Sequence, residues 1–478
     1  MARGDRLVLA LAALAAFAAY LALERGELYG SDGAVMASVA QNMWLHGSVR
    51  ECCNAFGAFP QDPGPWSPFG IGYSIVLAPL WHFQLDRAPG GGLWLGLGNP
   101  LLLALSTVVL AKTGLVLGWR RSSAVLAALA FALLTMAPAY STEFFSEPGI
   151  TLAMSLMLLG LALWPTELSI GATLVGLGGM TAVLFRADST LLVLPAVGAA
   201  LATKQWRAVL RSWRRWLLQI GIPIGFALAW TLYYDWIRYG KLITSGYTGF
   251  YGRRGFDNPV MNGIGLQVWS PGKSFFLHSP ILIAAIPGLW WLARNSSRVV
   301  VGVAVLCGLR VVFYARWWTP IGGTFGWGPR FLMPLCAVLA LPLGATIERI
   351  LDLRSRSRRF CAIGALGVLA LVSAVVQLSS IALDRRDVSN PINNLAGIPL
   401  ARRPEILTQR RHDYQWHLGD SHILFNLRHL GSTGWETLWW FHDGASGIGL
   451  ALIALAALAC AAAIGVAILS DAVEQRST

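Results

Sequence analysis

The chain has 478 residues, of which 55% are hydrophobic and only 13% are charged, and its mean hydropathy is +0.56. Soluble domains carry about a quarter charged residues, so this composition excludes an ordinary soluble protein. The net charge of +13 comes from short basic clusters between apolar runs, and no nucleic-acid-binding motif accompanies them. The sequence therefore predicts an all-α polytopic membrane protein, with membrane lipids and no nucleic acid among its partners.

Apolar runs of the length needed to cross a bilayer recur from end to end of the chain. We count about 12 transmembrane helices. The predicted crossings are Leu7–Leu23, Leu93–Leu117, Ser122–Tyr140, Pro148–Trp164, Leu168–Phe185, Ser189–Thr203, Trp216–Tyr234, Phe276–Trp291, Val299–Tyr314, Phe331–Ile347, Phe360–Leu383 and Ile448–Leu469.

Short basic connections predict the orientation of these helices. One connection ends at Arg121, and two others span Lys204–Arg215 and Glu348–Arg359. The positive-inside rule places all three in the cytoplasm, together with the N-terminus that carries Arg3 and Arg6. We therefore expect a multi-pass protein of the cell (inner) membrane whose first loop, residues 24–92, is external.

One apolar stretch inside this loop is too short for a simple crossing. The segment Phe69–Phe83 contains Gly70, Gly72 and Pro79, and counting it as a span would place the Arg121 connection outside. We interpret it as a re-entrant or interfacial helix on the external face.

Three acidic residues then fall on that same face, near the ends of early helices. They are Asp32 in the first loop and Glu143 and Glu147 in the stretch "YSTEFFSEPG". Acidic side chains at membrane depth are costly and indicate function. The alternative is that they are solvated loop ends, or, for Glu147, that the carboxylate complements the dipole of the helix that starts at Pro148.

Six stretches occur in a fixed order within roughly the first 340 residues. They are "SDGAVMASVAQNMWLHG" (Ser31–Gly47), "WSPFGIGYSIVLAPLW" (Trp66–Trp81), "YSTEFFSEPG" (Tyr140–Gly149), "FRADS" (Phe185–Ser189), "SPGKSFFLHSP" (Ser270–Pro280) and "GGTFGWGPRFLMP" (Gly322–Pro334). Together they resemble the C-type (GT-C) membrane glycosyltransferases, which include protein O-mannosyltransferases, aminoarabinose transferases and mycobacterial arabinosyl- and mannosyltransferases. The resemblance implies a GT-C-like fold with external juxtamembrane helices in the first loop.

The resemblance also implies an activity. Members of this superfamily transfer a sugar from a polyprenyl-phosphate donor at the non-cytoplasmic face, and inversion is usual for lipid monophosphate donors. The acceptor is then a hydroxyl of a cell-envelope glycan, a glycolipid or a protein. The first acidic motif of the family often has a second acid and a nearby tyrosine, where this chain has Gly33 and Met36. This departure puts a two-acid metal site in doubt, so we predict no metal ligands and leave a divalent cation open.

The chemistry of such a transfer suggests roles for the acids. The acceptor hydroxyl loses a proton as it attacks the anomeric carbon, and a carboxylate within hydrogen-bond reach takes that proton. We assign Asp32 as the general base. Glu147 matches the second acidic motif of the family and is expected to position the acceptor or support the base, with Glu143 as an alternate.

The phosphate of the donor needs cations at headgroup depth on the same side. Arg186, Lys273 and Arg330 occupy external junctions and are the candidates, although Arg186 also has Asp188 as a local partner. Trp327 is expected to stack on a sugar ring. For Lys112 and Arg310, which lie inside apolar segments, we predict no role.

The remaining features concern the division of the chain into regions. Residues 1–347 form the predicted catalytic region, and residues 348–478 form a C-terminal transmembrane region whose loop, 384–445, caps the site from outside. The "WWFHDG" at Trp439–Gly444 is treated as a chance match to an oligosaccharyltransferase signature. His278, His417 and His442 have no ligand spacing and are interpreted as polar loop or interface residues.

Two other classes of protein share these features. A lipid-linked-sugar flippase or another polytopic transporter would also be basic on its inner side, and a non-catalytic assembly factor needs no site. A transporter, however, should place polar residues near mid-membrane on broken helices, whereas here the acids gather at one face. Sugar transfer from a radiolabelled polyprenyl-phosphate donor distinguishes these alternatives.

Overall fold

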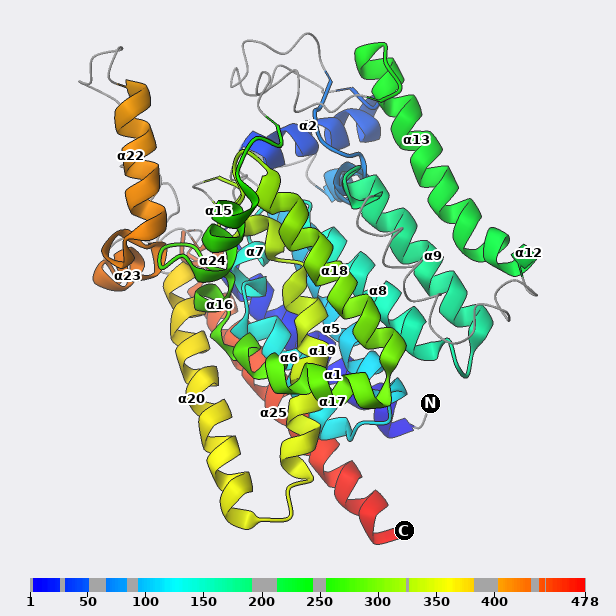
Figure 1. The fold of residues 1–478 in the computed structure, drawn as a ribbon, viewed down its shortest axis with the longest axis vertical. Coiled ribbons are helices and arrows are strands. Elements are labelled where there is room, and N and C mark those ends of the chain that lie inside the picture. Colours follow the sequence, from blue (N-terminus) through cyan, green and yellow to red (C-terminus); the bar gives the residue numbers. More distant parts are fainter. Residues whose placement is uncertain are drawn as a thin grey trace.

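The computed structural model describes residues 3–25, 31–50, 66–83, 93–190, 213–243, 255–323, 326–381, 403–430, 438–442 and 444–477. Within these ranges every regular element is a helix (Figure 1). The predicted crossing Ser189–Thr203 and the first part of the loop 384–445 lie largely outside the described residues.

Among the residues that the structure describes, seven helices are long and apolar enough to cross a bilayer, which makes the chain a multi-pass membrane protein. Their lengths suit a hydrocarbon core about 30 Å thick. They are α1 (Arg3–Leu23), α5 (Gly98–Val116), α9 (Leu168–Phe185), α13 (Ile222–Tyr239), α18 (Ser297–Arg316), α20 (Arg356–Ile381) and α25 (Ser446–Ser477).

Three shorter helices occupy the centre of the bundle. These are α6 (Arg121–Leu134), α8 (Glu147–Leu163) and α19 (Leu335–Leu351), and most of their side chains are buried. Because other helices surround them, they need no apolar face of full membrane length. The total of twelve crossings remains a prediction.

The segment Phe276–Trp291, predicted as one crossing, does not form one helix. It is divided into α16 (Phe275–His278), a 3₁₀ turn at Pro280–Ala284 and α17 (Ala285–Asn295). Pro280 has no backbone N–H and cannot extend α16. With 11 residues, α17 is about 16 Å long and too short to cross the bilayer by itself.

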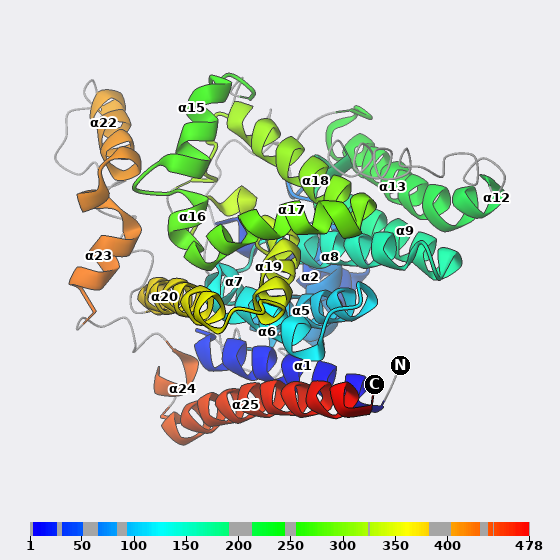
Figure 2. The same cartoon turned by 60° about the horizontal axis from the view of Figure 1, so that its bottom comes forward.

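The first and last long helices pair along their length. Figures 1 and 2 both show α1 and α25 side by side. At one end of this pair, Asp471 of α25 accepts hydrogen bonds from the backbone N–H groups of Arg121 and Ser122, at 3.0 Å each. A carboxylate there satisfies N–H groups at the start of α6 that have no partner within the helix. Arg121 also pairs with Asp5 of α1 at 2.8 Å.

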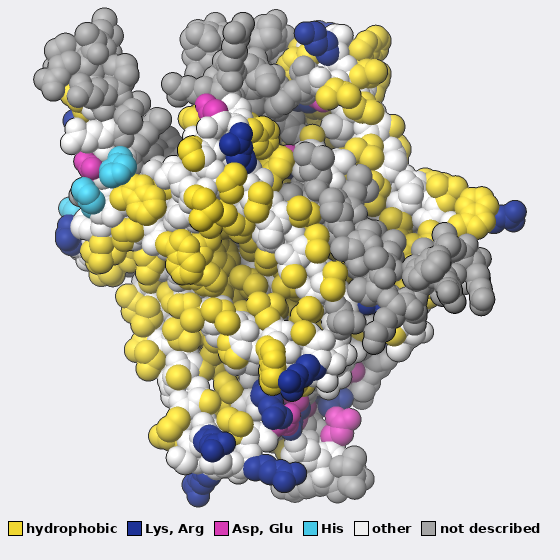
Figure 3. Space-filling model, in the orientation of Figure 1, with side chains coloured by type: hydrophobic (Ala, Val, Ile, Leu, Met, Phe, Trp, Pro, Cys, Tyr) yellow, Lys and Arg dark blue, Asp and Glu magenta, His cyan; other side chains and the backbone are white. Residues whose placement is uncertain are grey.

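Several basic side chains gather at one end of the bundle. Hydrophobic side chains cover the middle of the face drawn in Figure 3, and basic side chains gather at its lower end. We call this the basic end; it includes Arg120, Arg349 and Arg356 at the ends of central helices. The opposite end holds α2 (Ser31–His46) (Figure 1). This separation agrees with the expectation of a cytoplasmic basic side.

The first loop folds against the end opposite to the basic end. The segment Phe69–Phe83 forms only a short helix α3 (Gly72–Leu77) and a 3₁₀ turn at Ala78–Phe83, so it is no full crossing, as predicted. Ser74 donates to the carbonyl of Met36 at 2.8 Å, and Trp81 donates to that of Ala37 at 3.0 Å. These bonds attach α3 and the turn to α2.

The described part of loop 384–445 contains α22 (Arg403–Trp416), α23 (His422–Arg428) and α24 (Trp439–His442). In Figure 1, α22 and α23 lie beside the upper end of α20. The indoles of Trp439 and Trp440 donate to the carbonyls of Leu21 and Ala22 in α1, at 3.0 and 2.7 Å. These two tryptophans therefore fasten α24 to α1, which is a structural role.

A cysteine scan tests the predicted orientation. His46 at the end of α2 and Ser355 before α20 are both exposed, so cysteines placed there are equally available to a thiol reagent. In intact cells, we expect an impermeant maleimide to label His46→Cys and not Ser355→Cys, and permeabilisation should make both react. Labelling of Ser355→Cys from outside would reverse the orientation.

Candidate active site

Asp32 and Glu147 are joined by one arginine. Asp32 lies in the first turn of α2, and Glu147 is the first residue of α8. Arg330 begins the 3₁₀ turn η5 (Arg330–Leu332), which precedes α19. Arg330 Nη2 is 2.8 Å from Asp32 Oδ2, and its Nε is 2.9 Å from Glu147 Oε1. Segments far apart in the sequence thus meet at a single guanidinium, which also lies 3.7 Å from the ring centre of Phe145.

The network continues through a second arginine. Arg186 directly follows α9; its Nη1 is 3.2 Å from Glu147 Oε1, and its Nε is 3.2 Å from Asp188 Oδ1. The hydroxyl of Tyr314 donates to the other oxygen of Asp188. Burial raises the pKa of Asp188, but the positive charge of Arg186 and the Tyr314 hydrogen bond outweigh it, so this pKa lies below its ordinary value. Asp188 is therefore ionised at neutral pH and holds Arg186 in place.

Glycines allow the start of α8 and the end of α9 to meet. A Cβ atom at Gly149 would overlap the ring of Phe185, so a glycine is required two residues after Glu147. On the other side, a Cβ at Gly70 or Gly72 would overlap the backbone or ring of Phe185. Because Phe185 is fixed between α8 and α3, the next residue, Arg186, is held beside Glu147.

Packing leaves no room for a side chain at Gly33, where the resemblance would place a second acid. A Cβ atom at Gly33 would overlap that of Phe144, so no acidic side chain fits at this position. Asn99 anchors the facing segment by donating to the carbonyls of Glu143 and Phe145. The close contact between α2 and this segment brings Asp32 towards Glu147 without a second carboxylate.

The described residues do not fit a divalent cation between the two acids. In these ranges no group of three or more His, Cys, Asp or Glu side chains is arranged to hold a metal. The guanidinium of Arg330 itself takes the place between Asp32 and Glu147, and Gly33 supplies no further ligand. A positively charged side chain in that place disfavours binding of a cation.

No protein-family model matches the chain, and no curated protein matches it. Solved structures do. ArnT from Cupriavidus metallidurans bound to undecaprenyl phosphate has a TM-score of 0.53 and 16% identity, covering 96% of this chain and 78% of ArnT. The Archaeoglobus fulgidus oligosaccharyltransferase AglB, in complex with an inhibitory peptide and a dolichol-phosphate, has a TM-score of 0.51 and 12% identity, covering 87% of this chain and 60% of AglB.

These similarities extend over most of the chain and include proteins of two activities that share one architecture. The chain has the GT-C fold. The fold expected from the sequence is therefore confirmed. Within this GT-C fold, the network of Asp32, Glu147, Arg186 and Arg330 lies where α2, α8, α9 and η5 meet, and all four of its members were predicted as site residues.

The other predicted site residues lie outside this network of ion pairs or serve it indirectly. Glu143 is buried, and its carbonyl is held by Asn99. Lys273 is fully buried, and its ammonium donates to the carbonyls of Gly323 and Gly326. Lys273 thus holds the loop that leads to Arg330, and its contact with a phosphate stays a prediction.

Trp327 is covered where an open sugar-stacking face was expected. Its ring is 1% exposed; His422 of α23 stacks on it at 5.9 Å, and His278 approaches at 4.9 Å with its edge. The expectation that His278 is a polar loop or interface residue is wrong, because its side chain is 0% exposed. Trp327 thus connects the loop that contains Arg330 to helix α23.

Sequence reasoning missed Arg310. It lies in α18 with a fully buried side chain, and its Nε donates to the carbonyl of Phe331, the residue after Arg330. An arginine inside an apolar run was the available signal, but arginines near helix ends often extend to the membrane surface. Here the guanidinium is fully buried, lies against the ring of Tyr314 and is bonded to the carbonyl of Phe331, so it does not extend to the surface.

The contact at Gly149 can be tested by adding one methyl group. We expect Gly149→Ala to reduce the free energy of unfolding by about 1–3 kcal/mol through overpacking, and to lower activity because Phe185 must move and carry Arg186 with it. Gly364→Ala in α20 is the matched control, since nothing lies within 4 Å of its added Cβ, and it should be neutral or stabilising. Thermal unfolding in detergent measures both; equal melting temperatures would contradict the contact.

Proposed function

We propose that the chain is a GT-C glycosyltransferase that moves a sugar from a polyprenyl-phosphate donor to a hydroxyl acceptor at the external face of the membrane. The observation that carries this proposal is the ion network that joins Asp32, Glu147 and two arginines at the end opposite to the basic end. Its carboxylates can accept a proton from an acceptor hydroxyl, and its two arginines can bind the phosphate of a donor. The GT-C fold, and the undecaprenyl phosphate and dolichol-phosphate named for ArnT and AglB, support it.

Exposure separates the roles of the two acids. The Asp32 side chain is 15% exposed, whereas that of Glu147 is 0% exposed. An acceptor that arrives from outside therefore reaches Asp32 first, which favours Asp32 as the general base. Glu147 accepts from both Arg186 and Arg330 and so sets the distance between the two cations; it is a positioning residue in this mechanism.

The transfer itself forms one bond and breaks another. The acceptor oxygen bonds to the anomeric carbon while Asp32 takes the hydroxyl proton. The bond between the anomeric carbon and the phosphate oxygen breaks, and its electron pair leaves with the lipid phosphate. Arg186 and Arg330 stabilise the charge that develops on that phosphate, because guanidinium groups match its oxygens with paired donors. Attack opposite to the leaving group inverts the anomeric centre.

Arg330 also supplies the positive charge that a divalent cation would bring to this site. Its guanidinium contacts both acids, so they lie close together without mutual repulsion. When a donor phosphate binds, the same guanidinium has an additional anion within reach. We therefore propose a reaction that runs without a divalent cation.

A transporter remains the alternative class, and Arg310 is the feature that a transporter would share. However, Arg310 lies within two turns of the end of α18 at Arg316, and the network around it contains residues of loops and helix starts. The polar site is therefore at one end of the bundle, which favours an enzyme. The test uses purified protein in lipid vesicles, with a radiolabelled polyprenyl-phosphate sugar and a hydroxyl acceptor. Labelled acceptor supports an enzyme. Movement of intact donor across the bilayer without transfer would contradict it.

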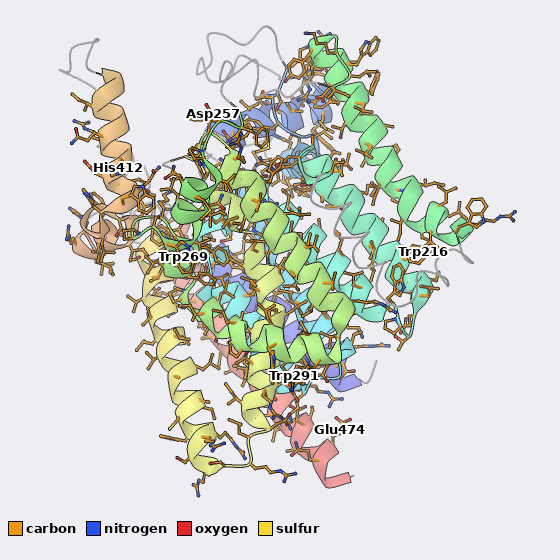
Figure 4. All side chains as sticks on the ribbon, viewed as in Figure 1. Trp216, Asp257, Trp269, Trp291, His412 and Glu474 are labelled. Carbon is orange, nitrogen blue, oxygen red and sulfur yellow. The ribbon has the colours of Figure 1, made fainter. Side chains whose placement is uncertain are left out.

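Replacing the proposed base should abolish most turnover. We expect Asp32→Asn to lower kcat by about 10²–10⁴-fold, because the amide keeps the shape but cannot take the proton, while donor binding is retained. Asp257→Asn is the control: this exposed acid lies at the same end of the molecule (Figure 4) and should leave kcat unchanged. Steady-state rates at saturating donor decide it; near-normal turnover in Asp32→Asn would remove the general base from the mechanism.

Removal of divalent cations with EDTA should distinguish a site that uses Arg330 from one that uses a metal ion. We expect the wild type to keep its activity in EDTA, since Arg330 already places a positive charge between the two acids. Arg330→Ala should lose about 10²-fold or more in kcat/KM, because the contacts to both acids disappear and the phosphate loses a ligand. Arg330→Lys should recover part of it, as it keeps the charge without the planar fork. Loss of wild-type activity in EDTA and its return with Mg²⁺ or Mn²⁺ would contradict the proposal.

A further inference from the structure

Arg310 is a buried charge for which the proposed mechanism has no role so far. It lies six residues before the end of α18 at Arg316, about 9 Å along the helix axis, and its side chain is 0% exposed. Its Nε donates to the carbonyl of Phe331. Within the described ranges, its Nη1 and Nη2 have no hydrogen-bond partner. One edge of the guanidinium is thus accounted for, and the other is not.

The guanidinium of Arg310 lies beside the ion network of the candidate active site. The guanidinium carbons of Arg310 and Arg186 lie 5.1 and 5.6 Å from the ring centre of Tyr314, so both arginines flank one aromatic ring. The Tyr314 hydroxyl donates to Asp188, and its ring stacks on Phe331 at 4.2 Å. A chain of contacts therefore links Arg330 to Arg310 through Glu147, Arg186, Asp188 and Tyr314. Arg310 in turn bonds the carbonyl of Phe331, the residue that follows Arg330.

Such a group is costly unless it has a partner. Buried polar groups are almost always hydrogen-bonded, and an ionised side chain in a membrane-spanning helix indicates a functional site whose partner should be identified. The bond to Phe331 explains one donor of the guanidinium. If Arg310 served only to hold that carbonyl, a side chain with a single donor would suffice, and the positive charge would have no function.

A second unsatisfied atom indicates the chemistry of the missing partner. Glu147 Oε2 is buried and also lacks a hydrogen-bond partner among the described residues. The network therefore presents unused donors on Arg310 and an unused acceptor on Glu147. A glycosyl phosphate carries both complements, since its phosphate oxygens accept hydrogen bonds and its sugar hydroxyls donate them. A purely apolar ligand carries neither set, and a purely cationic ligand has no acceptor for Arg310.

We propose that Arg310 is a ligand of the donor's phosphate, contributing Nη1 and Nη2 beside the guanidinium of Arg186. This inference rests on the proposed function and adds a third arginine to its donor site, supplied by a membrane-spanning helix. The N–H groups of Nη1 and Nη2 suit the oxygens of a phosphate, because the planar guanidinium binds two oxygens at once. Arg310 then holds the lipid phosphate both before the transfer and as the leaving group.

The test measures the binding of undecaprenyl phosphate to purified protein in detergent, with undecaprenol as the lipid that lacks the phosphate. We expect Arg310→Met to weaken the affinity for undecaprenyl phosphate by about 10–100-fold, as the loss of charge-assisted hydrogen bonds implies. Arg310→Lys should give an intermediate affinity. Lys112→Met is the matched control, because Lys112 is a half-buried cation in another membrane helix, α5, and should bind like the wild type. None of the variants should change the binding of undecaprenol.

Folding is checked for each variant by its melting temperature. Wild-type affinity in a folded Arg310→Met would overturn the inference and leave Arg310 as a support for Phe331. If Arg310→Met does not fold, Arg310→Lys decides, since it keeps the charge and a donor for Phe331 but lacks the fork; wild-type affinity there would overturn the inference. A wild type that binds undecaprenyl phosphate no better than undecaprenol would overturn the proposed function as well, so the two failures are distinguishable.

Discussion

The site depends on one electrostatic constraint, which is that Asp32 and Glu147 lie close together only because Arg330 is between them. Two carboxylates in a poorly solvated place repel each other. The guanidinium removes this repulsion and joins α2, α8 and η5. Arg186 extends the same principle to the end of α9, so the geometry of the site is set by alternating charges.

Much of the candidate site could be predicted from the sequence, because Glu147, Arg186 and Arg330 stand directly beside the ends of predicted apolar runs and Asp32 lies in the external loop that follows the first one. Their types and positions indicated carboxylate and phosphate chemistry before any contact was known. The pairing could not be predicted: nothing in the chain shows that Arg330 contacts both acids, or that Gly149 admits the ring of Phe185. These contacts depend on packing between segments that are far apart in sequence.

Predictions were less successful where tertiary contacts decide the surroundings of a side chain. From hydropathy alone, Arg310 is one charged residue within an apolar run, whereas the Tyr314 ring and the Phe331 carbonyl make it an internal neighbour of the network. A tryptophan in an external loop suggests an open ring, yet His422 of a distant segment covers Trp327. The crossing predicted at Phe276–Trp291 was judged by its apolar length, although Pro280 ends the first helical turn.

The pairing of α1 with α25 has a consequence for biosynthesis. Translation proceeds from α1 towards α25, so the first helix enters the membrane long before the helix that covers its face exists. During that interval lipid or the insertion machinery must occupy this face, and the N–H groups at the start of α6 lack the carboxylate of Asp471. The contact between α1 and α25 therefore forms only after α25 has been made, when α25 displaces whatever has occupied its place beside α1.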